Sequence, residues 1–306
     1  MRRIAPLAVI CLVAAVIAGC SSSSSGPSLI DWFNAATWQS LSDFPPGSGL
    51  GAALVSANGG TLYAIAGGTD DPTENDFWRY DIALDQWVQL ADTIDDPYWA
   101  ASLAWAGGDT IYMIQGNGVA GFSGYSVSDD TWYELADFPG TVRRAGHSLV
   151  WPRQGGYLYC CEGDGGGVFK RYDIAADAWE SLASIPRRMW HGNSIEWGGG
   201  NTIYAAADSL EFYAYDISMD AWTPRADYPD ELDLGAWLSY DGHESLFLAR
   251  GDTTSTIWRY DIPTDAWESI EDAPETVTHG GTMVSVDEAL YLLPGGTSTS
   301  FWALKE

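Results

Sequence analysis

The chain has 306 residues, of which 14 are Lys or Arg and 42 are Asp or Glu, giving a formal net charge of −28. A field of this sign repels DNA, RNA and anionic lipid, so the composition excludes a partner bound through overall positive charge. The sequence also contains 16 Trp and 16 Tyr, which is too aromatic for a disordered acidic chain. We therefore expect a globular protein whose fold uses many tryptophans.

The first residues have the pattern of an export signal. Arg2 and Arg3 precede an apolar run over residues 4–18, which is shorter than the roughly 18 or more residues of a membrane-spanning helix. The run leads into residues 16–20, Val-Ile-Ala-Gly-Cys, which resemble a bacterial lipobox. The resemblance implies cleavage before Cys20 and attachment of lipid to it. A simple signal peptide with an incidental Cys is the alternative.

These features divide the chain into three parts. We expect a lipoprotein signal peptide over residues 1–19, a lipidated Cys20 with a flexible Ser-rich tether over residues 20–30, and one folded domain over residues 31–306. This organisation predicts an extracytoplasmic protein that is attached to the cell envelope through its lipid alone. Where the cell has an outer membrane, we expect the protein there.

Two adjacent cysteines, Cys160 and Cys161, remain in the expected mature chain. Neighbouring Cα atoms lie about 3.8 Å apart, which is below the range of about 4.4–6.8 Å that is usual for disulfides. Successive residues of a strand also face opposite sides of the sheet. We therefore expect two buried thiols, with a strained vicinal disulfide as the alternative.

A tryptophan recurs along the chain at intervals of 43 to 49 residues, at Trp38, Trp87, Trp132, Trp179, Trp222 and Trp267. A tyrosine stands seven residues before each of the last five, as in Tyr-Asp-Ile-Ala-Ala-Asp-Ala-Trp at 172–179. Tyr and Ile favour a strand and Asp favours a turn, so the pattern predicts a β-hairpin whose second strand opens with Trp. We expect the second Asp of each copy to hydrogen-bond the turn backbone and to be structural: Asp85, Asp130, Asp177, Asp220 and Asp265.

Two more short strands are expected upstream of each hairpin. One is apolar, as at residues 62–65, and runs into glycines such as Gly67 and Gly68. The other is rich in small residues, as at residues 146–151. Four short strands in a period of about 45 residues are typical of a propeller blade, so we predict an all-β propeller.

The apolar strand, the glycine doublet, the spaced Tyr and Trp, and the Pro-Arg-Arg start at residues 186–188 together resemble the kelch repeat, as in the central domain of galactose oxidase. The resemblance covers residues 31–306. It is interrupted at residues 206–208, Ala-Ala-Asp, and at residues 116–118, Gly-Asn-Gly, where a glycine doublet is expected. The last repeat lacks the strand that opens with Trp, and residues 37–41 supply such a strand. We therefore predict six blades, with the N-terminal strand completing the last blade.

Propellers bind ligands at a mouth of the central channel, where loops converge. In this sequence a group of Arg and His residues falls in or beside the loops that lead into two neighbouring innermost strands: Arg143, Arg144, His147, Arg187, Arg188 and His191. Arg250 lies in another loop, next to a glycine. Because Arg suits bidentate contacts to a carboxylate, this group predicts a site for an anionic ligand. The alternative is that these Arg residues pack between blades, as they often do in kelch repeats.

Three tryptophans, Trp99, Trp190 and Trp237, fall outside the repeated positions. Aromatic rings at a channel mouth stack on sugar faces, and they also serve as filler between blades; both interpretations stay open. The sequence lacks the motifs of common hydrolases, zinc proteases, phosphate-binding loops and EF-hands. We expect no cofactor and no metal site, because the four His fall in four different blades and the acidic loop at residues 70–76 fits a solvated loop better than a calcium site.

We expect a monomeric binding or scaffold module rather than an enzyme, with a glycan, an anionic sugar or a protein as its ligand at the propeller mouth, and no nucleic acid partner. Six-bladed kelch propellers include the periplasmic sialic acid mutarotases, and similarity to them implies an alternative activity as a sugar-processing enzyme. In that case Arg188 or Arg250 holds the carboxylate and Glu162 moves a proton. A purely structural envelope protein is the third alternative.

Overall fold

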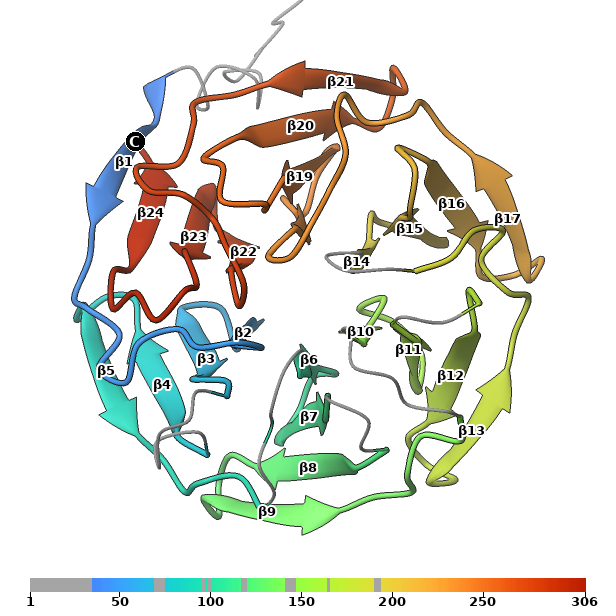
Figure 1. Cartoon of the computed structure of the whole chain (residues 1–306). Coiled ribbons are helices and arrows are strands. Elements are labelled where there is room, and N and C mark those ends of the chain that lie inside the picture. The colour runs from blue at the N-terminus through green and yellow to red at the C-terminus, as the bar shows by residue number, and fades with distance from the viewer. Residues whose placement is uncertain are drawn as a thin grey trace, which may run out of the picture.

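The computed structural model describes residues 35–68, 75–94, 97, 101–116, 120–140, 147–163, 166–189 and 194–306. Within these residues, 24 strands form six antiparallel sheets of four strands each. The sheets stand as blades around a central channel, each with one strand at the channel and one at the outer rim (Figure 1). The prediction of an all-β, six-bladed propeller is confirmed.

The strands of each blade run from the channel to the rim in the following order. Blade 1 comprises β2 (Ala53–Ala57), β3 (Thr61–Ile65), β4 (Phe77–Asp81) and β5 (Gln86–Gln89), and blade 2 comprises β6 (Ser102–Trp105), β7 (Thr110–Ile114), β8 (Phe122–Ser126) and β9 (Thr131–Glu134). Blade 3 comprises β10 (Ser148–Val150), β11 (Tyr157–Cys161), β12 (Phe169–Asp173) and β13 (Ala178–Ser181), and blade 4 comprises β14 (Ser194–Trp197), β15 (Thr202–Ala206), β16 (Phe212–Asp216) and β17 (Ala221–Pro224). Blade 5 comprises β18 (Trp237–Tyr240), β19 (Ser245–Ala249), β20 (Ile257–Asp261) and β21 (Ala266–Ser269), and blade 6 comprises β22 (Thr282–Val286), β23 (Ala289–Leu293), β24 (Trp302–Lys305) and β1 (Thr37–Ser40).

The ring is closed by strands from the two ends of the chain. β1 pairs antiparallel with β24, and Trp38 lies opposite Leu304. The outermost strand of blade 6 therefore comes from the N-terminal side and its other three strands come from the C-terminal side, as Figure 1 shows. This confirms the prediction that the N-terminal strand completes the last blade.

Neighbouring blades are joined at the rim by a repeated contact, which we call the clasp. In blade 3, the Tyr172 hydroxyl donates to Asp177 Oδ1 at 2.7 Å, and the same oxygen accepts the N–H of Ala136 at 2.8 Å. The Trp179 indole N–H donates to the carbonyl of Ala136 at 2.8 Å. Ala136 follows the outermost strand of blade 2, so the clasp satisfies both backbone groups of one residue of the preceding blade.

The clasp corrects one prediction. The second Asp of the hairpin motif is structural, but its partners are the tyrosine and the preceding blade rather than its own turn. The first Asp holds the turn, since Asp173 Oδ1 accepts the N–H groups of Ala175 and Ala176 at 2.9 and 3.0 Å. Asp177 has a left-handed backbone, with φ of 48°, which directs its side chain away from the turn.

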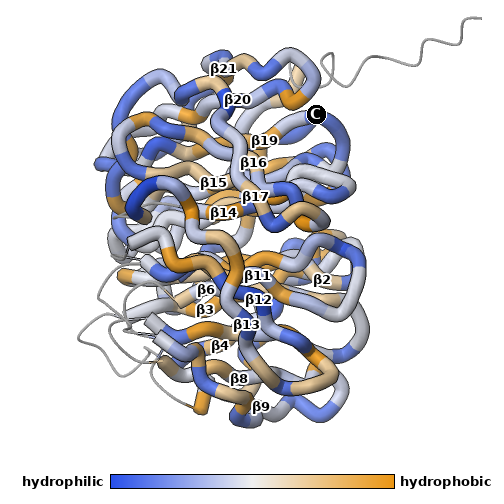
Figure 2. Tube along the Cα trace, turned by 90° about the vertical axis from the view of Figure 1, so that its right-hand side faces the viewer, coloured by the Kyte–Doolittle hydropathy of each residue, from blue (hydrophilic) through white to orange (hydrophobic). Residues whose placement is uncertain are grey.

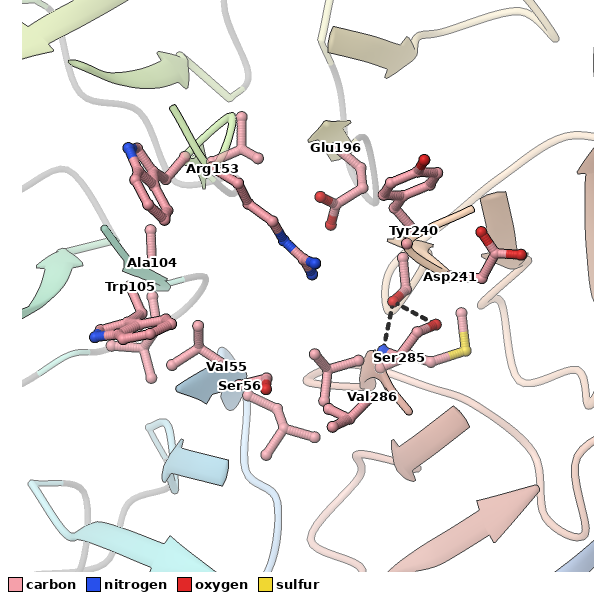
Figure 3. Close-up of a pocket in the computed structure, with 18 of the residues that line it drawn as sticks. Val55, Ser56, Ala104, Trp105, Arg153, Glu196, Tyr240, Asp241, Ser285 and Val286 are labelled. Atoms are coloured by element: carbon pink, nitrogen blue, oxygen red, sulfur yellow. Dashed lines mark hydrogen bonds between the residues drawn. The ribbon is translucent and has the colours of Figure 1, made fainter. Parts of the chain in front are cut away.

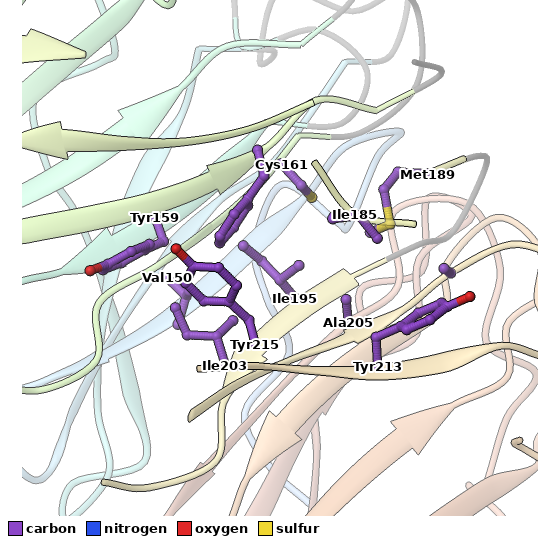
Figure 4. Packing of buried hydrophobic residues seen from close by; sticks show 12 residues of the cluster. Val150, Tyr159, Cys161, Ile185, Met189, Ile195, Ile203, Ala205, Tyr213 and Tyr215 are labelled. Atoms are coloured by element: carbon purple, nitrogen blue, oxygen red, sulfur yellow. The ribbon is translucent and has the colours of Figure 1, made fainter. Parts of the chain in front are cut away.

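The core consists of six apolar clusters, and each lies between two neighbouring blades. Figure 4 shows the cluster between blades 3 and 4, where Val150 and Tyr159 meet Ile195, Ile203 and Tyr215. In Figure 2 the apolar segments run along the strands inside the ring, and hydrophilic residues gather in the turns at its edges. Burial between blades is therefore the main source of stability, because no blade covers both of its faces alone.

The seam between blades 5 and 6 is the one among the described residues without a clasp. Leu304 occupies the place of the tyrosine and Ala36 that of the aspartate, and both are buried in an apolar cluster. Trp38 is present, but its buried indole Nε1 has no hydrogen-bond partner in the part of the chain that the structure describes. The closing seam is therefore held by apolar packing and strand pairing without the polar contact of the other five.

Both remaining cysteines are free, and each is completely buried, which confirms the prediction of two buried thiols. Burial raises the pKa of Cys161 to about 12, so this thiol stays protonated and unreactive at neutral pH. The expected signal peptide, Cys20 and the tether lie outside the described residues and stay predictions. No helix in the described part of the chain is long and apolar enough to cross a bilayer.

Candidate functional site

The central channel contains a cavity of about 460 Å³. We call the side of the ring where the innermost strands begin the start face, and the side where they end the end face. The polar side chains of the cavity come from the ends of the innermost strands or from the residues just after them, at the end face. Figure 3 shows Arg153, Glu196, Tyr240, Asp241 and Ser285 around this opening.

Arg153 follows β10 and extends its guanidinium toward the middle of the opening (Figure 3). Its Cζ lies 5.5 Å from the centre of the Trp197 ring, a distance at which a cation is attracted to the ring face. Among the described residues Arg153 makes no ion pair, although the protein carries a net charge of −28. Its φ of 52° is rare for a residue with a side chain. The geometry therefore presents a cation to the cavity at some cost in backbone strain.

Glu196 carries a carboxyl group at a position where the other five blades have apolar or small residues. In the strand pairing, the equivalent residues of the other innermost strands are Val55, Ala104, Val150, Ser239 and Val284. Oε1 of Glu196 accepts the N–H of Trp197 at 2.8 Å. Burial raises the pKa of Glu196 to about 7, while the Trp197 N–H and Arg153 oppose this rise. The side chain therefore exchanges a proton near neutral pH.

The next position of each innermost strand divides the ring into an aromatic part and a serine part. Blades 2 to 5 carry Trp105, Trp151, Trp197 and Tyr240, whereas blades 6 and 1 carry Ser285 and Ser56. The three indole N–H groups donate to a glycine carbonyl of the following turn, at 3.2, 3.3 and 3.1 Å. The Tyr240 hydroxyl donates to the carbonyl of His243 at 2.6 Å. These bonds fix the rings, and Trp105, Trp151 and Tyr240 form part of the cavity wall.

The predicted site residues that the structure describes belong mostly to the start face. Arg187 pairs with Glu211 at 2.5 Å, and Arg188 is exposed. Arg250 pairs with Asp230 at 3.2 Å and reaches Asp252 at 3.8 Å. In these contacts Arg187 and Arg250 brace loops of the start face through ion pairs.

His147 and Trp237 are two predicted residues with different environments. His147 is 2% exposed, its ring packs edge-on against Phe138, and neither ring nitrogen has a hydrogen-bond partner among the described residues. Burial lowers the pKa of His147 to about 4, so the ring is neutral at pH 7. Trp237 begins β18 and lines the central cavity, and it is the one predicted site residue found in the described cavity wall.

Five predicted residues, Trp99, Arg143, Arg144, Trp190 and His191, lie outside the described residues and stay predictions. Sequence reasoning missed Arg153, Glu196, Tyr240 and Asp241. A signal for Glu196 was present, because aligning the innermost strands shows one Glu where four others have Val or Ala. Within the described residues no group of three or more His, Cys, Asp or Glu side chains is arranged to hold a metal ion.

Comparison with known proteins agrees with this architecture. Residues 51–93, which form blade 1 and its flanking loops, match the family model of the Kelch motif. The protein is therefore a six-bladed propeller whose first blade matches the Kelch motif. The chain is similar in structure to the protein described as "Structure of YjhT", with a TM-score of 0.68 and 14% sequence identity over 87% of this chain and 95% of that one.

At 14% identity this likeness shows the fold alone. The propeller matches 1463 chains of solved structures, so structural likeness does not select one activity among them. The comparison with curated protein sequences gave no match. The function therefore has to be argued from the channel site.

Proposed function

We propose that this kelch propeller is a binding module that takes a small acidic sugar into its central channel from the end face. The observation that carries the proposal is Arg153, a cation that points into a 460 Å³ cavity without an ion-pair partner among the described residues. A guanidinium binds a carboxylate through two parallel hydrogen bonds. In a strongly acidic protein, this local positive charge selects where an anionic group docks.

The remaining lining supports a sugar as the carrier of that anionic group. The volume is within the range of about 300–1,000 Å³ that is usual for small-molecule sites. Trp105, Trp151 and Tyr240 offer apolar surface for a sugar ring. The carboxyl oxygens of Glu196 and Asp241 can accept hydrogen bonds from sugar hydroxyl groups. The Ser285 hydroxyl can donate or accept one. A protein ligand and a purely structural role remain as outcomes of the test below.

A sugar-processing activity of the mutarotase type is the second candidate, and Glu196 is the observation that favours it. Opening a sugar ring requires a proton to leave the anomeric hydroxyl and a proton to reach the ring oxygen. A carboxyl group whose pKa is raised to about 7 by burial is suited to both steps at neutral pH. Arg153 would hold the carboxylate in this reaction, the role that the resemblance to the sialic acid mutarotases implied for Arg188 or Arg250.

The test is titration calorimetry of the full chain with sialic acid, and with neutral N-acetylglucosamine as the comparison sugar. We expect sialic acid to bind and Arg153→Gln to weaken binding at least tenfold, because a charge-assisted bidentate contact is lost. Arg225→Gln, at an exposed residue directly after the outermost strand of blade 4, is the matched control and leaves binding unchanged.

Three other outcomes would contradict this proposal in different ways. Binding that survives Arg153→Gln but is lost in Arg188→Gln would place the site at the start face. No binding of either sugar would favour a protein ligand or a structural role. Faster anomer exchange in NMR at catalytic protein concentration, lost in Glu196→Gln, would make the protein an enzyme rather than a simple binder.

We also propose that the kelch propeller is held at the cell envelope through Cys20. The lipobox-like sequence at residues 16–20 and the Ser-rich tether support this location. Metabolic labelling with a fatty acid is expected to mark the wild-type protein and not Cys20→Ser. Equal labelling of the two proteins would contradict it.

A further inference from the structure

A second cavity of about 320 Å³ opens beside the channel cavity, between blades 6 and 1. Its lining consists of Gly60, Ile82, Val286, Asp287, Glu288, Ala289, Tyr291, Lys305 and Glu306. Val286 and Asp287 belong to the walls of both cavities. The two spaces are therefore neighbours on the end face, and we call the second one the cleft.

The cleft is open because blade 1 lacks the aromatic residue that covers the preceding blade at two other seams. Trp151 of blade 3 lies over Gly107 of blade 2, where a Cβ would meet the indole ring at 3.3 Å. Tyr240 of blade 5 lies over Gly199 of blade 4, where a Cβ would meet the hydroxyl at 2.7 Å. The equivalent residue of blade 1 is Ser56, whose side chain is too short to cross to blade 6. Figure 3 shows Ser56 and Val286 facing each other at this side of the opening.

We propose that the channel cavity and the cleft form one elongated site for an oligosaccharide, with an acidic sugar at its end in the channel and neutral sugars along the cleft. This inference rests on the proposed function, because Arg153 supplies the anchor for the acidic end. It goes beyond that function by assigning a chain-like ligand to the kelch propeller.

The chemistry of the cleft favours neutral sugars over other chains. The carboxylate oxygens of Asp287, Glu288 and Glu306 accept hydrogen bonds from sugar hydroxyl groups, and the ammonium group of Lys305 donates them. The same carboxylates repel a second anionic group, so a polyanionic chain is excluded from the cleft. Asp287 and Glu288 both have left-handed backbones, with φ of 43° and 60°, and this turn sets them at the cleft wall.

The apolar part of the lining fits the same ligand. Ile82 is partly exposed and, with Val286 and Ala289, it gives the cleft an apolar wall between its polar groups. Sugar units present alternating hydroxyl-bearing and C–H surfaces, which match such a mixed lining. A basic peptide is the other chain that carboxylates attract, and the test separates the two.

The experiment compares the affinity of the full chain for sialic acid with its affinity for sialyllactose, in which a neutral disaccharide extends the acidic sugar. We expect sialyllactose to bind at least tenfold more tightly. Ile82→Trp fills the cleft and is expected to reduce sialyllactose affinity to that of sialic acid, with sialic acid binding itself unchanged. Ile82→Val keeps the cleft open and is the matched control. Glu288→Ala, at an exposed turn, is a second variant, for which we expect a severalfold loss for sialyllactose alone.

The outcomes separate this inference from the function on which it rests. If sialic acid itself does not bind, the proposed function fails. If sialic acid binds and sialyllactose binds no better, or if neither Ile82→Trp nor Glu288→Ala changes sialyllactose affinity, the elongated site is overturned. Tight binding of a trilysine peptide that Ile82→Trp abolishes, without a gain for sialyllactose, would assign the cleft to a basic peptide and overturn the inference as well.

Discussion

At the outer rim of this propeller equivalent positions of the blades carry the same residues, whereas in the channel wall they carry different ones. At the rim the same Tyr–Asp–Trp clasp occurs five times, and the distance from the tyrosine hydroxyl to the aspartate oxygen stays between 2.6 and 2.8 Å. In the channel wall, equivalent positions carry Val, Ala, Glu or Ser in different blades. The comparison shows that residues which repeat hold the blades together, and residues which break the repeat form the candidate site.

The closing seam is the exception at the rim. Its Trp38 is retained while Leu304 and Ala36 replace the other two clasp residues, so one indole N–H is buried without an acceptor. The chain ends meet in this blade, because β1 and β24 are the first and last strands. The loss of the polar contact therefore coincides with the place where the hairpin motif is split between the two ends of the chain.

The largest expected effect comes from breaking one clasp. Asp177→Ala removes the acceptor of the Tyr172 hydroxyl and of the Ala136 N–H, and it places alanine in a left-handed backbone. Two orphaned donors and this strain predict a loss of about 3 kcal/mol in the free energy of unfolding. Urea denaturation of the full chain measures it.

The control for that variant is Glu134→Ala, which removes an exposed carboxylate from the outermost strand of blade 2. We expect a change below about 0.5 kcal/mol for this control. Equal losses for the two variants would mean that the clasp is no more than a surface contact.

A smaller effect is expected from the channel wall, and it depends on pH. Burial raises the pKa of Glu196 to about 7, so between about pH 4.5 and 7 the folded protein holds a proton that the unfolded chain releases. Stability contributed by this group is complete at low pH and falls as the pH rises through 7, by about 1–3 kcal/mol. Glu196→Gln removes this pH-dependent contribution. We expect the variant to be more stable than wild type at pH 8 and not at pH 4.5.

The contribution of His147 to stability changes with pH in the opposite direction. The Glu196 test therefore compares the pH profile of wild type with that of Glu196→Gln. Burial lowers the pKa of His147, so its contribution is present above about pH 6.5 and is lost as the pH falls toward 4. Both wild type and Glu196→Gln contain this group, and it cancels. Glu244→Gln, an exposed residue of blade 5, is the control and leaves the pH profile unchanged. Parallel profiles for wild type and Glu196→Gln would rule out a partly buried Glu196 that exchanges a proton near neutral pH.

The smallest expected effect compares one substitution at two seams. Trp179→Phe removes an indole that donates to Ala136 at 2.8 Å, whereas Trp38→Phe removes an indole whose N–H has no partner. Both variants lose apolar area, but only the first loses a hydrogen bond. We therefore expect Trp179→Phe to cost about 1 kcal/mol more in the free energy of unfolding than Trp38→Phe. Equal costs would remove the distinction between the clasped seams and the closing seam.

Sequence alone predicted the blade count, the strand order within a blade and the closure by residues 37–41, and the structure confirms all three. It did not predict the clasp partners, since the hydrogen bond from the Ala136 N–H to the Asp177 carboxylate joins residues 41 positions apart. It did not predict the channel site either. Arg153, Glu196 and Tyr240 belong to three different blades, and nothing in their local sequence says that their side chains face one opening.

The sequence by itself determined the architecture because the five clasped seams among the described residues require the same contacts between neighbouring blades. That requirement repeats the same residue types every 43 to 49 positions, and a repeat is visible without coordinates. Only the tertiary structure decided which side chains surround the channel and where the cleft opens. Those features arise from the residues that depart from the repeat, and closure of the ring is the step that brings residues from separate blades together.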